Sequence, residues 1–234
     1  PGSGTPTGNV TVTDGVDSCI GTVAAGTCNL TLTTVGARTL IATYAGDANF
    51  TTSNDTEAHQ VDQAIPSISA TGGSFTFDGN PHAATGFAYG IGGVGDVLIP
   101  AVTFSYTGSG ATVYGPSATA PTNAGTYDVA VNFAGNTNYT SASTTTTITI
   151  GLANQTITVN TSAPTAAVNG SSFNVVATAS SGLPVTISVS GVCTVADLDG
   201  SVTDGDATVS MTSGTGTCSV FYDQAGNANF NPAP

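Results

Sequence analysis

The sequence has almost no basic residues. Its 234 residues include no lysine and a single arginine, Arg38, against 14 acidic residues, so the formal charge is −13. Charged residues of both signs make up 6% of the chain, compared with about 25% in an average soluble domain. A surface that binds nucleic acid needs clustered cations to neutralise phosphates. The composition therefore excludes nucleic-acid binding, and it also excludes any site that depends on a lysine.

Long apolar runs and tryptophan are missing as well. No stretch approaches the roughly 20 apolar residues that cross a bilayer as a helix, so we expect no membrane span. The chain opens on Pro1 without a charged and then apolar leader, and we expect any signal peptide to have been removed.

Apolar and polar residues alternate along much of the chain. Hydrophobic residues make up 39% of it, which argues against disorder in spite of the abundant Gly, Ser, Thr and Asn. Val, Ile, Thr, Tyr and Phe carry runs of period two that are bounded by turn residues, and no window shows a helical period. These runs lie at residues 9–15, 28–35, 125–133, 144–150 and 155–160. The pattern predicts an all-β chain.

One short motif occurs three times, at residues 45–50, 134–139 and 225–230, with separations of 89 and 91 residues. Each copy has a Gly-Asx pair followed by an aromatic residue, and each follows a strand pattern that opens on a glycine ten positions before the loop glycine. We expect a strand, a tight loop and an aromatic ring packed against the end of a sheet. The aromatic residues are Phe50, Tyr139 and Phe230.

The repeat predicts three tandem modules of about 90 residues, the size of an immunoglobulin-like β-sandwich. Their boundaries fall at 1–62, 63–150 and 151–234, and short connectors join them in an elongated rod. Alternate residues of the strand before each loop are expected on the core side. These residues are Leu40, Ala42 and Tyr44; Val129, Val131 and Phe133; and Val220, Tyr222 and Gln224.

The outer modules are expected to be incomplete. The first has 35 residues before its strand-opening glycine and the third has 65, a difference of about two strands. Eleven residues follow Tyr139 in the second module, but only four follow Phe230 in the third. The first module therefore lacks its first strands and the last lacks its final strand. Either the sequence is a window of a longer array, or neighbouring chains complete the sheets by strand donation.

These motifs resemble the bacterial Ig-like repeats of very large secreted and surface-anchored proteins. Residues 5–55 are similar to such a repeat without its first strands, residues 72–143 to modules that accompany these repeats, and residues 154–234 to a further Ig-like repeat. The resemblance implies an extracellular structural or adhesive role. It implies no shared active site.

The four cysteines fall two and two, with Cys19 and Cys28 in the first module and Cys193 and Cys218 in the third. Of three possible connectivities, pairing within modules is the simplest. Zinc binding is the alternative, but the spacing lacks a CxxC pair and the histidines lie elsewhere. Disulfides would place the protein in an oxidising compartment outside the cytosol.

Candidate chemical sites are few. His59 and His82 are the two histidines; Asp78 lies close to His82, but it belongs to a β-turn signature. The glycine-rich stretch 90–95 imitates a phosphate loop without the helix that such a loop requires. The densest acidic cluster, Asp197, Asp199, Asp204 and Asp206, is a hypothetical calcium site that does not fit an EF-hand. We therefore predict no catalytic, cofactor-binding or metal-binding residues, and no enzyme.

The composition and the repeat together predict a structural module of an extracellular fibre, stalk or surface filament. Its expected partners are neighbouring Ig-like modules or copies of itself. The alternatives are an adhesin that binds surface glycans and a filament subunit completed by strand donation between chains.

Overall fold

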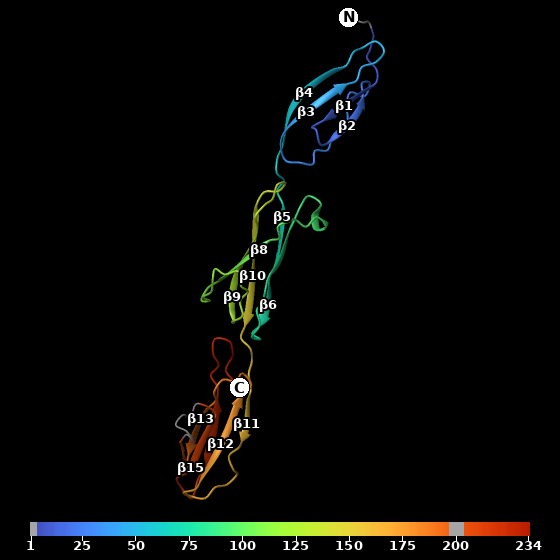
Figure 1. Ribbon diagram of the computed structural model, residues 1–234. Helices are drawn as coiled ribbons and strands as arrows, with labels where there is room; N and C mark the ends of the chain where they lie inside the picture. The colour runs from blue at the N-terminus through green and yellow to red at the C-terminus, as the bar shows by residue number, and fades with distance from the viewer. Residues whose placement is uncertain (1–3, 197–203) are drawn as a thin grey trace. The chain divides into compact units, whose positions relative to one another are not determined.

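The computed structural model describes residues 4–196 and 204–234 and is all-β, as expected (Figure 1). Within these residues the one helical element is a 3-10 turn, Gly93–Gly95. None of the described helices is long and apolar enough to cross a membrane.

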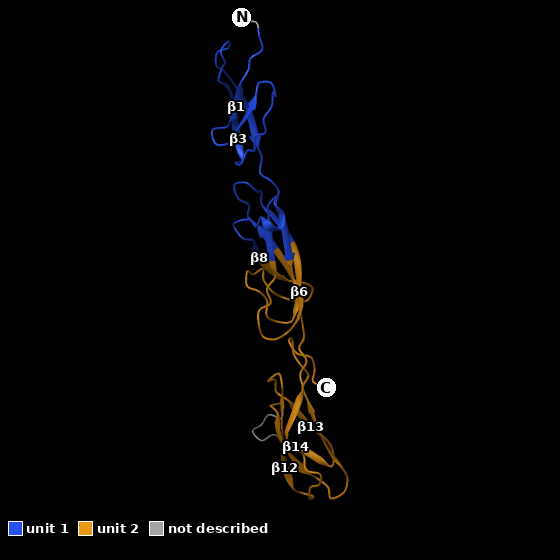
Figure 2. Ribbon diagram, turned by 90° about the vertical axis from the view of Figure 1, so that its right-hand side faces the viewer, with its two compact units in different colours: residues 1–70, 86–103, 131–144 blue, residues 71–85, 104–130, 145–234 orange. Residues whose placement is uncertain are grey.

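The chain divides into two compact units (Figure 2). Unit 1 comprises residues 1–70, 86–103 and 131–144, and unit 2 comprises residues 71–85, 104–130 and 145–234. The division cuts across the two long strands 125–133 and 142–151. The three modules predicted from the sequence, with boundaries at residues 62 and 150, divide the chain differently from these two units. The module boundaries remain a prediction.

Residues 4–62 contain one four-stranded sheet, in the order β2-β1-β3-β4. All of its neighbouring strands are antiparallel, and β3 pairs with β4 along nine residues. The run at 28–35 was expected to be a strand but joins no sheet, because no neighbouring strand pairs with it. The four strands are β1 (Asn9–Thr13), β2 (Ser18–Thr22), β3 (Gly36–Tyr44) and β4 (Ser53–Val61).

Two sheets lie in residues 67–151. One pairs β5 with β7, and the other has the order β6-β10-β9-β8, in which β6 runs parallel to β10. Ala88, Leu98 and Phe133 form a buried cluster within unit 1. The strands are β5 (Ser67–Thr71), β6 (Gly73–Thr76), β7 (Thr85–Tyr89), β8 (Thr103–Gly108), β9 (Gly125–Phe133) and β10 (Ala142–Gly151).

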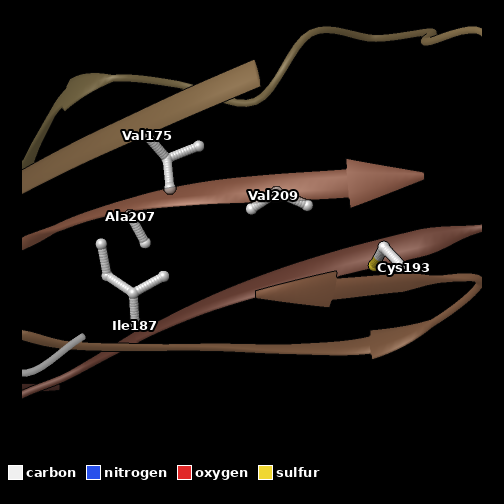
Figure 3. Close-up of a cluster of buried hydrophobic side chains, with 5 residues drawn as sticks. All are labelled: Val175, Ile187, Cys193, Ala207 and Val209. Carbon is white, nitrogen blue, oxygen red and sulfur yellow. The ribbon is translucent and has the colours of Figure 1, made fainter. Parts of the chain in front are cut away.

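Residues 157–196 and 206–223 form two sheets that pack face to face. Figure 3 shows Val175, Ala207 and Val209 of the larger sheet packed with Ile187 of the smaller one. The larger sheet has the order β11-β12-β15-β14, and the smaller one pairs β13 with β16. The strands are β11 (Ile157–Thr161), β12 (Ser172–Ala179), β13 (Thr186–Gly191), β14 (Cys193–Ala196), β15 (Asp206–Met211) and β16 (Cys218–Asp223).

The predicted core positions are buried to different degrees. Val129, Val131 and Phe133 are at most 1% exposed, which confirms the prediction for β9. Leu40 and Ala42 occupy the same places on β3 but are only half-buried, and none of residues 4–62 is fully buried. The reason is architectural: an apolar sheet face is buried by a second layer, and residues 4–62 contain one sheet.

This difference predicts unequal costs for matched truncations. Val129→Ala removes fully buried methyl groups and should destabilise β9 by about 2 kcal/mol. Leu40→Ala removes more atoms, but from an open face, so we expect about 1 kcal/mol or less in β3. Native-state hydrogen exchange of the two strands measures both changes separately. An equal or larger cost for Leu40→Ala would show that the face of β3 is covered.

Candidate functional site

The repeated motif folds into the same loop three times. In the first copy, the Asp47 carboxylate accepts hydrogen bonds from the backbone N–H groups of Asn49 (2.8 Å) and Phe50 (2.9 Å). Asn136 and Asn227 accept the corresponding pairs at 2.8–3.0 Å. In all three copies the backbone N–H of the Asx residue also donates to the carbonyl of the aromatic residue, at 2.9–3.0 Å. The three loops are therefore equivalent in detail, and the aromatic side chains are half-buried.

Each loop also requires its glycine. Gly46, Gly135 and Gly226 have φ angles of 84°, 86° and 78°, in the left-handed region that favours glycine. A Cβ atom at Gly226 would lie 2.3 Å from the carbonyl oxygen of Phe230. Glycine is thus required in the loop for two reasons: its φ angle is positive, and a side chain would collide with the backbone.

The second loop binds the connector that follows β4. The Ala64 N–H donates to the carbonyl of Asn138 (2.9 Å), and the Thr140 N–H donates to the carbonyl of Ala64 (3.0 Å). The result is a one-residue parallel β-bridge between Ala64 and Tyr139. The Gln63 side chain adds a bond to the carbonyl of Asn136 at 2.8 Å.

The third loop repeats this arrangement. The Ala153 N–H donates to the carbonyl of Asn229, and the Asn231 N–H donates to the carbonyl of Ala153, both at 2.9 Å. Neither bridge is predicted by the sequence patterns described above. The signal was an alanine two or three residues beyond the strand end in both connectors, since β4 ends at Val61 and β10 at Gly151.

A buried polar network supports the third loop. Gln155 and Gln224 are 2% and 8% exposed, and the Gln155 amide donates to the Gln224 side chain (2.8 Å) and to the carbonyl of Asn231 (2.7 Å). The Gln224 amide donates to the carbonyl of Pro184, and the Ser181 hydroxyl donates to Gln155. The network explains why Gln224 stands where the other copies have an aromatic residue: buried amides need partners, and these have them.

The glycine-rich stretch is part of the same loop environment in unit 1. The Gly92 N–H donates to the Asp96 carboxylate, and the Tyr139 hydroxyl contacts that carboxylate at 3.3 Å. The Ile91 N–H donates to the Tyr139 hydroxyl. The Gly92 N–H is thus bound by a carboxylate of the protein itself, and the helical element within the stretch is a three-residue 3-10 turn, so the geometry is not that of a phosphate loop.

All four cysteines form disulfides, Cys19–Cys28 and Cys193–Cys218. The first joins β2 to the segment that follows its turn, and the second joins β14 to β16 and so links the two sheets of the last sandwich. Because both thiols of each pair are consumed, these cysteines are not zinc ligands.

The remaining candidates have ordinary structural partners. The His82 ring stacks on Phe75 at 4.3 Å and contacts Asp78 at 3.2 Å. Asp78 closes the predicted turn, and its bond from the Asn80 N–H lowers the pKa of its carboxyl. His59 is exposed on β4.

Only part of the acidic cluster lies within the residues that the structure describes. Arg38 pairs with Asp14 at 3.8 Å. The hypothetical calcium ligands Asp197 and Asp199 lie outside the described residues, whereas Asp204 and Asp206 lie within them. Residues 4–196 and 204–234 contain no group of three or more metal-binding side chains.

The Asx side-chain oxygen of each loop accepts two backbone hydrogen bonds, and two substitutions at one Asx position test how much these bonds contribute to stability. Asn227→Ala removes the acceptor of two backbone N–H groups and should destabilise the third loop by about 1 kcal/mol. Asn227→Asp keeps the acceptor, as Asp47 does in the first copy, and should be nearly neutral. Chemical denaturation at pH 7 compares the two, and equal losses would contradict the proposed role of the acceptor.

The first loop should also depend on pH. The bond from the Asn49 N–H, with those from Thr7, holds the pKa of Asp47 far below its usual 3.8. A lowered pKa in the folded state adds stability above about pH 4 that is lost as the pH falls toward the folded-state pKa. NMR shifts of the Asn49 and Phe50 amides should therefore report loop opening in acid. The control Asp47→Asn does not titrate, and the same acid transition in that variant would contradict the account.

Comparison with known protein families gave a match in the first part of the chain. Residues 1–62 match the family model described as Bacterial Ig-like domain (group 3). Neither the curated proteins nor the solved structures gave a match. The matched region contains the sheet β2-β1-β3-β4 and the first of the three loops. This region is therefore similar to a bacterial Ig-like domain, a type that indicates a non-enzymatic structural or adhesive module.

Proposed function

We propose that this chain is a non-enzymatic structural segment of an extracellular fibre, stalk or surface filament built from Ig-like modules in series. The observation that carries the proposal is the pair of connector bridges, at Ala64 and Ala153. In both places, two backbone hydrogen bonds join the connector to the loop of the module that follows. A connector bound in this way is part of its module rather than a free tether.

The bridges suit a load-bearing role. Each backbone hydrogen bond contributes about 0.5–1.5 kcal/mol net, and the two bonds act together at one residue. Gln63 and Gln155 add side-chain bonds beside the two bridges. The Cys193–Cys218 disulfide further joins two strands of the last sandwich covalently.

Several features support an extracellular location. Two disulfides fit an oxidising compartment. The absence of lysine and the single arginine leave one site for trypsin-like proteases, which suits an exposed protein. The expected partners are neighbouring Ig-like modules or copies of this chain.

Glycan binding by an adhesin is a second candidate function. One observation favours it: Phe87 on β7 is 50% exposed, and its ring lies 6.0 Å from that of Tyr89. Tyr89 itself is half-buried, so the exposed Phe87 ring is the surface suited to a sugar ring, with adjacent polar groups to orient it. Binding to a glycan array that is lost in Phe87→Ala would favour this function over the structural one.

Immunogold electron microscopy of intact cells tests the structural proposal. Antibodies against this chain should label surface fibres or stalks, and mass spectrometry of the native material under non-reducing conditions should find no free thiol. Labelling confined to the cell interior, with four free thiols, would contradict the proposal.

A further inference from the structure

The chain contains eight Asn-x-Ser/Thr triplets, the acceptor pattern of N-glycosylation, which neither the fold nor the proposed function uses. Such triplets also arise by chance in a chain rich in Asn, Ser and Thr. The structure separates them, because an acceptor needs an exposed asparagine with a free side-chain amide and a free hydroxyl two residues later. The eight asparagines are Asn9, Asn29, Asn49, Asn54, Asn138, Asn154, Asn160 and Asn169.

Three triplets lie where the backbone or the hydroxyl is already engaged. Asn9 and Asn54 belong to β1 and β4, and pairing with a neighbouring strand holds the backbone of each in the sheet. Asn169 lies in a turn, but the hydroxyl of Ser171 donates a hydrogen bond to the carbonyl of Val168 at 2.6 Å. A transferase would have to break these interactions to bind any of the three segments.

Two further triplets have engaged asparagine side chains. The side-chain oxygen of Asn154 accepts a hydrogen bond from the Asn231 amide at 2.8 Å. The side-chain oxygen of Asn160 accepts one from the Thr178 hydroxyl at 3.1 Å. Both asparagines therefore already make contacts within unit 2.

Asn29, Asn49 and Asn138 remain. All three are exposed, and neither their side chains nor the hydroxyls two residues later make a hydrogen bond within the described part of the chain. One difference sets Asn49 apart: it alone of the eight has an acidic residue, Asp47, two positions before it. A carboxylate at this position gives a transferase a charged group to bind in addition to the amide and the hydroxyl.

The third copy of the loop shows what the same asparagine does where the triplet is absent. There the equivalent of Asn49 is Asn229, and Asn231 stands in the place of the threonine. The Asn229 side chain accepts a hydrogen bond from the Ala124 N–H (2.9 Å) and donates one to Asn123 (3.2 Å), all within unit 2. The asparagine side chain of the third loop thus has a structural use, whereas that of the first loop has none among the described residues.

We propose that Asn49 carries an N-linked glycan and that residues 47–51 are the segment that its transferase recognises. The co-substrate is an oligosaccharide carried on a lipid diphosphate. The side-chain nitrogen of Asn49 bonds to the anomeric carbon of the first sugar, the bond from that carbon to the diphosphate breaks, and the lipid diphosphate leaves while the amide proton passes to a base of the transferase. The inference rests on the extracellular location in the proposed function, since the chain meets such a transferase during export.

The folded loop does not offer all the recognised groups at once. The Asp47 carboxylate accepts four hydrogen bonds, two from backbone N–H groups of the loop and two from Thr7. The transferase therefore binds residues 47–51 before the loop closes. Because the exposed Asn49 side chain makes none of the bonds of the closed loop, the attached glycan leaves those bonds intact.

Mass spectrometry of the native protein tests the assignment. The full chain is purified from the cells that produce it, digested, and fragmented so that the modified residue is located. We expect a saccharide mass on Asn49 and none on Asn138, whose loop is equivalent but lacks the acid. An unmodified Asn49 would overturn the proposal, and equal modification of both asparagines would overturn the role of Asp47.

Variants of the full chain in the same cells test the recognised groups. Asp47→Asn keeps a side-chain acceptor in the loop, as in the other two copies, but removes the charge, so occupancy of Asn49 should fall at least about tenfold. Thr51→Ala should abolish the modification, and Thr51→Ser should retain it because the hydroxyl is kept. Hydrogen exchange of β3 checks that each variant folds. Unchanged occupancy in Asp47→Asn or in Thr51→Ala would overturn recognition of that group.

Immunogold labelling of the same cells keeps this inference separate from the proposed function. Labelling of surface fibres by a chain with an unmodified Asn49 would overturn the glycan site alone. Labelling confined to the cell interior would overturn the proposed function instead.

Discussion

Two backbone hydrogen bonds at one alanine are the interaction on which the organisation of this chain depends. Without them each connector would be a short free tether. With them, Ala64 and Ala153 belong to the loops at residues 134–140 and 225–231. The loops in turn depend on a glycine with positive φ and on an Asx side chain that satisfies two N–H groups. The local conformation of each loop thus determines whether it can bind its connector.

The need of backbone groups and apolar faces for partners also explains why the last sandwich has a buried core and the first domain does not. Backbone polar groups and apolar sheet faces both need partners. In the last sandwich, β12 supplies both, and Val175 and Val209 are fully buried. In the first domain residues 28–35 lack a paired strand, and Leu40 remains half-buried although its place in the repeat matches that of the buried Val129.

Much of the fold was predictable because it depends on local pattern. Alternating residues located β9 at the residues the structure shows, and the Gly-Asx-aromatic spacing located all three loops. Non-local pairing was not predictable in the same way. Residues 28–35 have a strand pattern but no sheet partner, and the bridge at Ala64 joins residues far apart in sequence through backbone atoms, which leave little trace in side-chain identity. The burial of Gln224 likewise depends on Gln155, a partner from a distant segment.

Amide hydrogen exchange at Ala64 and Ala153 tests the central claim most directly. If the loops hold the connectors, both amides will exchange at least about 100-fold more slowly than in an unstructured peptide. Exchange at the unstructured rate, with β9 and β12 still protected, would show that the connectors are free and would contradict the account.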